Sequence, residues 1–285
     1  MSSRSARFLP FLFVVLWSTG FIGARLGLPH IEPLTFLLIR YSAVLVCMTL
    51  IATLSRAPWP QGLRSWFHIG VAGLLVHGIY LGGVFVAISL GLPAGLASLV
   101  VGLQPLLTAL GAGYFLGASV SRRQWSGLLL GLLGVALVLS GKLGQEFGLA
   151  ALVPAVVALL GITAGTLYQK KFCPVFDWRS GAVAQFLPTT VVTGLAALAT
   201  EHFRIDWTGE LLFALGWLVL VLSIGAVSLL NWLIRHSSSV NVASLFYLVP
   251  PSTALFAWLL FDNTLSPLAL LGMALTVWGV YLARQ

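Results

Sequence analysis

The sequence predicts an all-α polytopic membrane protein, with ten transmembrane helices arranged as two inverted five-helix repeats. Three observations support this fold class: the composition, the number of long apolar runs, and the spacing of similar motifs in the two halves. Of the 285 residues, 59% are hydrophobic and 8% are charged, and the mean hydropathy is +1.02. Because a soluble domain carries about 25% charged residues, this composition excludes an ordinary soluble enzyme.

The net charge of +8 comes from 15 basic and 7 acidic residues. So few charges over so much apolar chain indicate membrane topology rather than nucleic-acid binding. The two cysteines, Cys47 and Cys173, cannot form a disulfide scaffold, and the sequence has no metal-ligand spacing. We therefore expect no metal, no cofactor and no nucleic-acid partner, with the lipid bilayer as the surroundings of the chain.

Ten apolar runs are long enough to cross a bilayer, which takes about 20 residues in a helix. Continuous runs exclude the alternating pattern of an outer-membrane barrel. The first run follows Arg4 and Arg7 like a signal peptide, but it is longer than the apolar part of one and lacks an Ala-x-Ala site, so we expect an uncleaved helix. The runs cover residues 8–28, 33–54, 66–88, 93–116, 124–140, 147–168, 181–199, 211–233, 239–261 and 266–283.

The basic residues of the connecting loops predict the orientation. Eleven of them fall on the side of the N-terminus and three on the other side, while Arg40 lies inside a run. Cytoplasmic loops carry the excess of Lys and Arg. The sequence therefore predicts a multi-pass protein of the cytoplasmic (inner) membrane with both termini in the cytoplasm.

Similar residues recur 144 to 146 positions apart, which is half the chain. A constant offset of this size indicates duplication, and we expect repeats at 1–142 and 143–285. Because each repeat holds five helices, an odd number, the second enters the membrane inverted, as in many secondary transporters. The matches are Thr19 with Thr163, Arg40 with Gln185, Ala97-Ser98-Leu99 with Ala243-Ser244-Leu245, Pro105 with Pro251, and Gly134-Val135 with Gly279-Val280.

Several motifs resemble those of one known family. They are Leu16-Trp17-Ser18-Thr19-Gly20-Phe21, Glu32-Pro33-Leu34-Thr35-Phe36 with Arg40, Ala97-Ser98-Leu99 with Gln104-Pro105, and Gln124-Trp125-Ser126-Gly127 leading to Gly131 and Gly134. Over its full length the chain resembles the EamA-type members of the drug/metabolite transporter superfamily. The resemblance implies a ten-helix carrier for small metabolites, often amino acids, usually moved outward. The family often has a Glu after helices 4 and 9, where this chain has Gly117-Ala118 and Asp262-Asn263, so no role for that Glu is carried over.

Three classes of function compete. A secondary carrier for an amino acid or related amphoteric solute, without enzymatic activity, is favoured by the duplication. An integral-membrane enzyme on lipid-linked substrates would need a base, nucleophile or metal cluster at the membrane face, yet the loops predicted to be cytoplasmic hold one acid, Asp177. A sensor or structural membrane subunit stays open, as does a homodimer. Among carriers, efflux of lipophilic cations is disfavoured because no Asp or Glu lies in the ten runs.

Few ionisable side chains lie inside the runs. Arg40 lies about seven residues, or ~10 Å of helix rise, into the second run. An intramembrane charge is a functional candidate by default, but Arg40 could equally bond the carbonyls of a broken neighbouring helix. For His77 a neutral, hydrogen-bonded structural role is favoured, although it could carry a proton.

Prolines inside the runs predict helix breaks that free backbone carbonyls, which in lipid must face protein or a wet cavity. Pro105 and Pro250-Pro251 occupy equivalent places in helices 4 and 9 and mark the expected substrate site, although they could merely curve the helices. We expect the site near the midplane, between helices 1, 3, 4, 6, 8 and 9. Its predicted substrate-binding residues are Trp17, Thr19, Arg40, His77, Tyr80, Gln104, Tyr168, Asn231 and Tyr247.

Overall fold

The computed structural model describes residues 3–92, 94–140, 148–173, 175–261 and 266–283, and over these it is almost entirely helical. The expected repeat boundary at 142/143 and the pair Asp262-Asn263 lie outside the described residues. Within the described part, eight helices are long and apolar enough to cross a membrane, and Pro267–Ala283 is a shorter apolar helix. The chain is therefore a multi-pass membrane protein, while the count of ten crossings stays a prediction.

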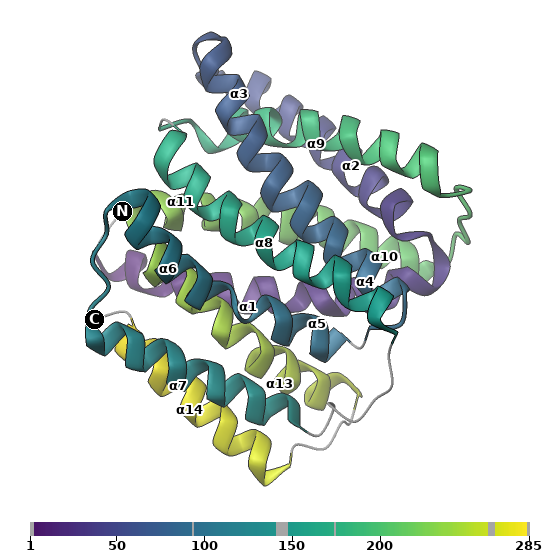
Figure 1. Ribbon diagram of the computed structural model, residues 1–285. Coiled ribbons are helices and arrows are strands. Elements are labelled where there is room, and N and C mark those ends of the chain that lie inside the picture. Colours follow the sequence, from purple (N-terminus) through teal and green to yellow (C-terminus); the bar gives the residue numbers. More distant parts are fainter. Residues whose placement is uncertain (1–2, 93, 141–147, 174, 262–265, 284–285) are drawn as a thin grey trace.

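The first half, in the order of Figure 1, contains α1 (Ser3–Gly27), η1 (Leu28–His30), α2 (Pro33–Leu54), α3 (Gly62–Gly73), η2 (Leu74–Leu81), α4 (Gly82–Ser89), α5 (Ala94–Val101), α6 (Gln104–Leu116) and α7 (Arg122–Leu139). The second half contains α8 (Leu149–Phe172), α9 (Trp178–Thr200), α10 (Gly209–Trp217), η4 (Leu218–Ala226), α11 (Val227–His236), α12 (Ser239–Ser244), η5 (Leu245–Leu248), α13 (Val249–Phe261) and α14 (Pro267–Ala283).

The two halves share the same irregularities at equivalent places. The helix of α3 and α4 and the helix of α10 and α11 each contain a π-helical segment in the middle, η2 and η4. The next helix in each half is interrupted: α6 begins at Gln104 with Pro105 in its first turn, and the 3-10 segment η5 precedes Pro250 in α13. Such irregular segments occur mainly at functional sites, because they leave backbone groups available in the membrane interior.

The packing follows the duplication as well. The helix α2 packs on α9 and on η4, whereas α9 packs on α2 and on η2. The last helices of the halves, α7 and α14, form a closely packed pair along one edge of the bundle (Figure 1). A Cβ atom on Gly134 would lie 2.6 Å from the carbonyl oxygen of Gly272, so these two backbones touch directly. Small residues permit this close approach of membrane helices.

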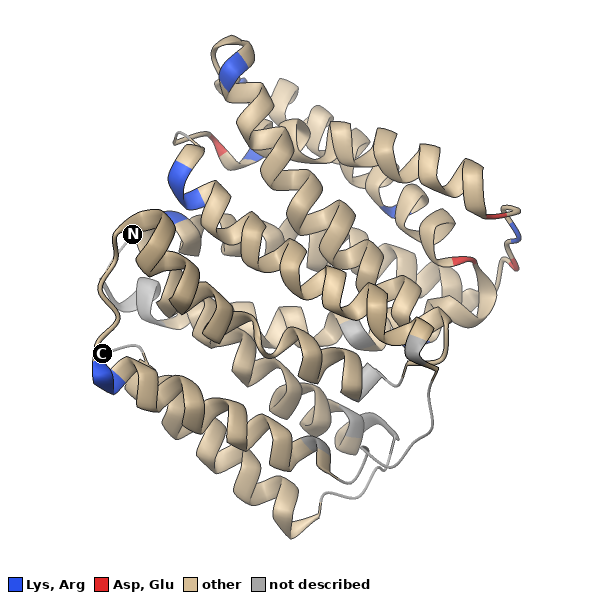
Figure 2. Ribbon diagram, viewed as in Figure 1, with Lys and Arg blue, Asp and Glu red and all other residues tan. Residues whose placement is uncertain are grey.

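The charged residues divide the molecule into two ends (Figure 2). We call the end where α1 begins and α14 ends the basic end; α8 and α11 also end there, with Lys170 and Arg235 in their last turns. We call the opposite end, with Glu32, Glu201 and Glu210, the acidic end. The excess of basic residues that the sequence assigns to one side of the membrane thus corresponds to the basic end.

At the acidic end, α2 and α9 are joined by two carboxylates. Glu201 accepts hydrogen bonds from the backbone N–H groups of Leu34 and Thr35 and from the Thr35 hydroxyl, each at 2.7 Å. Glu32 accepts from the backbone N–H groups of His202 and Arg204, at 3.0 and 2.9 Å. The backbone hydrogen bond from Arg204 leads the effects that lower the pKa of Glu32 below its ordinary value.

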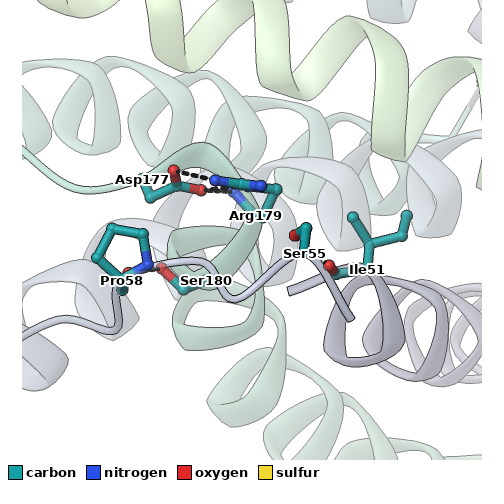
Figure 3. Close-up of polar contacts among 6 residues, drawn as sticks. All are labelled: Ile51, Ser55, Pro58, Asp177, Arg179 and Ser180. Atoms are coloured by element: carbon teal, nitrogen blue, oxygen red, sulfur yellow. Dashed lines mark hydrogen bonds and ion pairs between the residues drawn. The ribbon is translucent and has the colours of Figure 1, made fainter. Parts of the chain in front are cut away.

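At the basic end, fewer hydrogen bonds join α2 to α9 among the described residues (Figure 3). The Ser180 hydroxyl donates to the carbonyl of Pro58 at 2.6 Å, which joins the start of α9 to the loop after α2. Asp177 caps α9 by accepting from the backbone N–H of Arg179 at 2.9 Å, and it also pairs with the Arg179 guanidinium. Ser55 donates to the carbonyl of Ile51 within its own helix end. Among the described residues, more hydrogen bonds therefore cross between α2 and α9 at the acidic end.

Candidate functional site

A small central cavity lies between α1, α2, η2, α4 and the helix of η4 and α11. Its lining includes Trp17, Arg40 and Tyr80, with Val84 and Leu222 among the apolar residues. The cavity has a volume of about 30 Å³. This is room for about one water molecule, so the site is closed in this structure and must widen to hold a metabolite.

Arg40 is the charged group of this cavity. It is 3% exposed, and its Nε–H donates to the hydroxyl of Ser223 at 3.0 Å. Among the described residues its guanidinium forms no ion pair. The carbonyls of a broken neighbouring helix, which the sequence suggested as partners, do not accept from Nε–H, because this group donates to a hydroxyl from η4.

The aromatic wall is built by Trp17 and Tyr80. Their rings are stacked with centroids 6.4 Å apart, and the Trp17 indole N–H donates to the Tyr80 hydroxyl at 3.4 Å. Phe13 and Phe246 hold Trp17 from other sides, with centroids at 5.1 and 5.4 Å. Such an apolar wall with few hydrogen-bonding groups is typical of small-molecule sites.

Two predicted residues lie close to this cavity without lining it. Thr19 accepts a hydrogen bond from the Trp217 indole N–H at 2.9 Å and so ties α1 to α10. His77 is buried against Phe186, with ring centroids 4.4 Å apart, and among the described residues neither ring nitrogen has a partner within hydrogen-bonding geometry. The carbonyl of His77, within the π-helical segment, accepts from the Tyr41 hydroxyl at 2.8 Å.

Asn231 belongs to a buried amide cluster nearer the basic end, formed with Gln169 and Gln185. Gln169 donates to the Asn231 carbonyl oxygen at 2.9 Å, and the Asn231 amide donates to Gln185 at 3.1 Å. All three side chains are buried. The cluster links α8, α9 and α11, and Gln185 is the residue that matches Arg40 in the other half.

The remaining predicted residues lie elsewhere in the bundle. Gln104 is buried and donates to the Thr166 hydroxyl at 3.5 Å, whereas its side-chain carbonyl oxygen has no partner within the part of the chain that the structure describes. Tyr168 contacts His68 at 2.7 Å. Tyr247 packs in a separate core cluster with Val135 and Val280, and its buried hydroxyl forms no hydrogen bond with any described residue. Of the predicted set, the structure thus brings Trp17, Arg40 and Tyr80 to one cavity.

Sequence analysis did not include Ser223, Gln169 or Gln185 among the candidates. Ser223 lies in a run of apolar residues, and a lone serine there is ordinarily a contact between helices. The repeat offset contained the signal: Gln185 lies 145 positions after Arg40, and Ser223 lies 146 positions after His77.

Comparison with known proteins agrees with this architecture. The model of the EamA-like transporter family matches twice, over residues 4–140 and 149–285. The chain is similar to the "Probable amino-acid metabolite efflux pump" of Escherichia coli (strain K12), with 27% identity over 98% of this chain and 95% of that protein.

Two further relatives have no assigned substrate. The "Uncharacterized inner membrane transporter YedA" of Escherichia coli (strain K12) is 26% identical over 95% of this chain and 88% of that protein. The "Uncharacterized transporter YvbV" of Bacillus subtilis (strain 168) is 27% identical over 99% and 92%. A solved crystal structure superposes with a TM-score of 0.81 at 21% identity over 99% of this chain and 97% of the other, which supports the fold. Since the two family matches cover nearly all of the sequence, one in each half, this chain belongs to the EamA-like transporter family.

Proposed function

We propose that this transporter is a secondary carrier that exports an amino acid or a related amphoteric solute by alternating access. The observation that carries the proposal is the buried guanidinium of Arg40, which lines the central cavity and, in the described part of the chain, has one hydroxyl as its hydrogen-bond partner. The relatives named as amino-acid metabolite efflux pumps support the same class of solute.

The chemistry of Arg40 favours a carboxylate. A guanidinium has five N–H donors in a planar fork that matches a carboxylate, and the Nε–H is the one used by Ser223. A charge inside a membrane is costly unless another group compensates it. A solute carboxylate entering beside Trp17 and Tyr80 would supply that compensation, and their rings would contact its apolar part.

The duplication supports alternating access. In inverted-repeat transporters, substrate sites lie where interrupted helices of the two halves meet, and the halves rock about that site. Here η2 and η4 flank the cavity region, and α5–α6 and α12–α13 are interrupted at matching positions. The closed cavity and the well-joined acidic end are consistent with one state of such a cycle.

We further propose that the basic end faces the cytoplasm and that the protein resides in the inner membrane. The excess of Lys and Arg at that end follows the orientation rule and includes Arg56 in the loop before α3 and Arg122 and Arg123 in the first turn of α7. Export then runs from the basic end to the acidic end.

The test is counterflow in proteoliposomes with labelled amino acids, sugars and quaternary amines. We expect uptake of an amino acid, which Arg40→Gln abolishes for carboxylate-bearing solutes while the matched variant Arg122→Gln retains it. Arg122 lies on the exposed first turn of α7. Absence of flux for every amino acid would overturn the proposal, and flux of quaternary amines alone would assign the protein to cation efflux instead.

A further inference from the structure

A second and larger cavity opens at the basic end, between the start of α1, the segment before α9, and α11. Its volume is about 600 Å³, which lies within the range of about 300–1,000 Å³ typical of ligand pockets. Its walls are largely apolar and include Ile224, Leu229 and Trp232. The polar groups on its lining include one basic and one acidic side chain, Arg235 and Asp177.

Arg235 has unused hydrogen-bonding capacity. Its guanidinium carbon lies over the ring of Phe176 at 3.8 Å from the ring centroid, a cation–π contact that restrains the side chain. Its Nη2 atom is buried and has no hydrogen-bond partner, and among the described residues the guanidinium donates no hydrogen bond at all. A buried donor left unsatisfied is costly, so an anion placed here would be held by groups that are already ordered.

Asp177 supplies the opposite charge with one oxygen only partly used. Its Oδ1 accepts from the backbone N–H and the Nε–H of Arg179, each at 2.9 Å. Among the described residues, Oδ2 accepts one hydrogen bond, from Nη2 of the same Arg179 at 2.8 Å (Figure 3). A carboxylate oxygen has about two acceptor sites, so Oδ2 can still receive a proton donor. The Arg179 guanidinium lowers the pKa of Asp177 from an ordinary value of 3.8 that is already far below neutral pH, so the carboxylate is charged with or without Arg179.

The floor of this cavity leads toward the centre of the bundle. Asn231 lines it and also belongs to the buried amide cluster with Gln169 and Gln185. A solute held at Arg235 and Asp177 is therefore separated from the interior by amides that can exchange hydrogen bonds with it.

We propose that this cavity is a second binding site, in which Arg235 binds the carboxylate and Asp177 binds the ammonium of an α-amino acid with an apolar side chain. The apolar part lies against Trp232 and Leu229. This inference rests on the proposed function. If the basic end faces the cytoplasm and the protein is an exporter, this cavity is where the solute binds first. It narrows the solute class to molecules that carry an ammonium and a carboxylate group on the same carbon atom.

The test measures occupancy of this cavity directly. Ser228, which lines it, is replaced by cysteine in a Cys47→Ala, Cys173→Ala background, and the rate of maleimide labelling is followed in nanodiscs without phosphatidylethanolamine. L-phenylalanine, 3-phenylpropionate and phenethylamine are the three probes. We expect L-phenylalanine to slow labelling of Ser228→Cys and to leave Ser126→Cys, on α7 outside the cavity, unchanged.

Two substitutions then separate the charges. Arg235→Gln should raise the concentration of L-phenylalanine that half-protects the cysteine about tenfold and abolish protection by 3-phenylpropionate, while phenethylamine still protects. Asp177→Asn should weaken protection by phenethylamine and L-phenylalanine, with 3-phenylpropionate unaffected. The matched control is Arg179→Gln, which removes the same ion pair but leaves the carboxylate in the cavity and should not weaken protection by any probe.

The proposal is overturned if L-phenylalanine gives no protection, or protects equally in Arg235→Gln. It is also overturned if phosphatidylethanolamine alone slows labelling in a manner that Arg235→Gln removes, because the site then holds a lipid headgroup. Counterflow distinguishes this failure from that of the proposed function: amino-acid flux with no protection removes the second site alone, and protection with no flux removes the carrier function alone.

Discussion

The carboxylates of Glu32 and Glu201 each bind the backbone that follows the other residue. Glu201 accepts from the N–H groups of Leu34 and Thr35, just after Glu32, and Glu32 accepts from those of His202 and Arg204, just after Glu201. The two acids thus satisfy free N–H groups at the start of α2 and in the loop after α9. The exchange joins the two halves of the chain at one end.

Replacing Glu201 by alanine should weaken this junction. The substitution removes the acceptor for two backbone N–H groups and one hydroxyl, and losing a charged acceptor costs about 1–3 kcal/mol. We expect a melting temperature in detergent several degrees below that of the wild type. Glu210→Ala is the matched control, since Glu210 is exposed and its carboxylate pairs with His30 at the surface; an equal loss in both variants would contradict the role of Glu201.

The junction should also weaken in acid. The folded-state pKa of Glu32 is lowered from its ordinary value of 4.5, so its contribution to stability is full above that value and is lost as the pH falls through the folded-state pKa. The wild type should lose more stability than Glu32→Gln between about pH 6 and pH 3. Melting temperatures of both proteins across this range test it, and parallel curves would refute it.

Substitution of Tyr80 by alanine should damage substrate binding. It removes the ring stacked on Trp17 and one wall of the central cavity. We expect KM for the transported solute to rise about tenfold, corresponding to ~1.4 kcal/mol of lost binding. Tyr114→Ala, at a residue 86% exposed on α6, provides the control. Unchanged KM in Tyr80→Ala would exclude Tyr80 from the site.

A methyl group at Gly134 should separate α7 from α14. Its Cβ would lie 2.5 Å from the backbone nitrogen of Thr276 and 2.6 Å from the carbonyl oxygen of Gly272, and backbone cannot move aside as a side chain can. Overpacking of this kind costs about 1–3 kcal/mol. Gly113→Ala, whose nearest neighbour lies at 3.7 Å, should leave the melting temperature unchanged or raise it. A melting temperature of Gly134→Ala that is equal to or above that of Gly113→Ala would contradict the close contact of α7 and α14.

Orientation can be read from two exposed positions at opposite ends. We expect an impermeant maleimide added outside intact cells to label Glu210→Cys and to spare Arg64→Cys, because the loops around Arg64 carry the basic excess. Cell lysis before labelling should expose both. The reverse pattern in intact cells would place the basic end outside.

Much of the helical framework could be predicted from the sequence, because apolar runs and prolines act locally. Pro105 and Pro250 lie in the first turns of helices that follow interruptions. The π-helical segments could not be predicted, because Leu74–Leu81 and Leu218–Ala226 have the same apolar composition as a regular helix. Hydropathy records how much of a segment is apolar and contains no information on its hydrogen-bond spacing.

The candidate site could be predicted less completely from the sequence, for a related reason. Arg40 could be recognised as a buried charge from its place in an apolar run, but its partner Ser223 lies 183 residues away on another helix. The Glu32–Glu201 exchange is hidden in the same way, because loop acids 169 positions apart look solvated when each is considered alone. Contacts of this kind depend on how the repeats interlock, which only the three-dimensional structure supplies.

The direct backbone contact between α7 and α14 has a mechanical consequence. Where two helices are in backbone contact, as at Gly134 and Gly272, no side-chain rotamer can change to let them tilt closer together. The pair therefore behaves as one stiff beam. Any rocking of the halves must then pivot around this beam rather than deform it. In the transport cycle proposed above, the other helices of each half are the moving parts, and α7 and α14 together form the axis about which they turn.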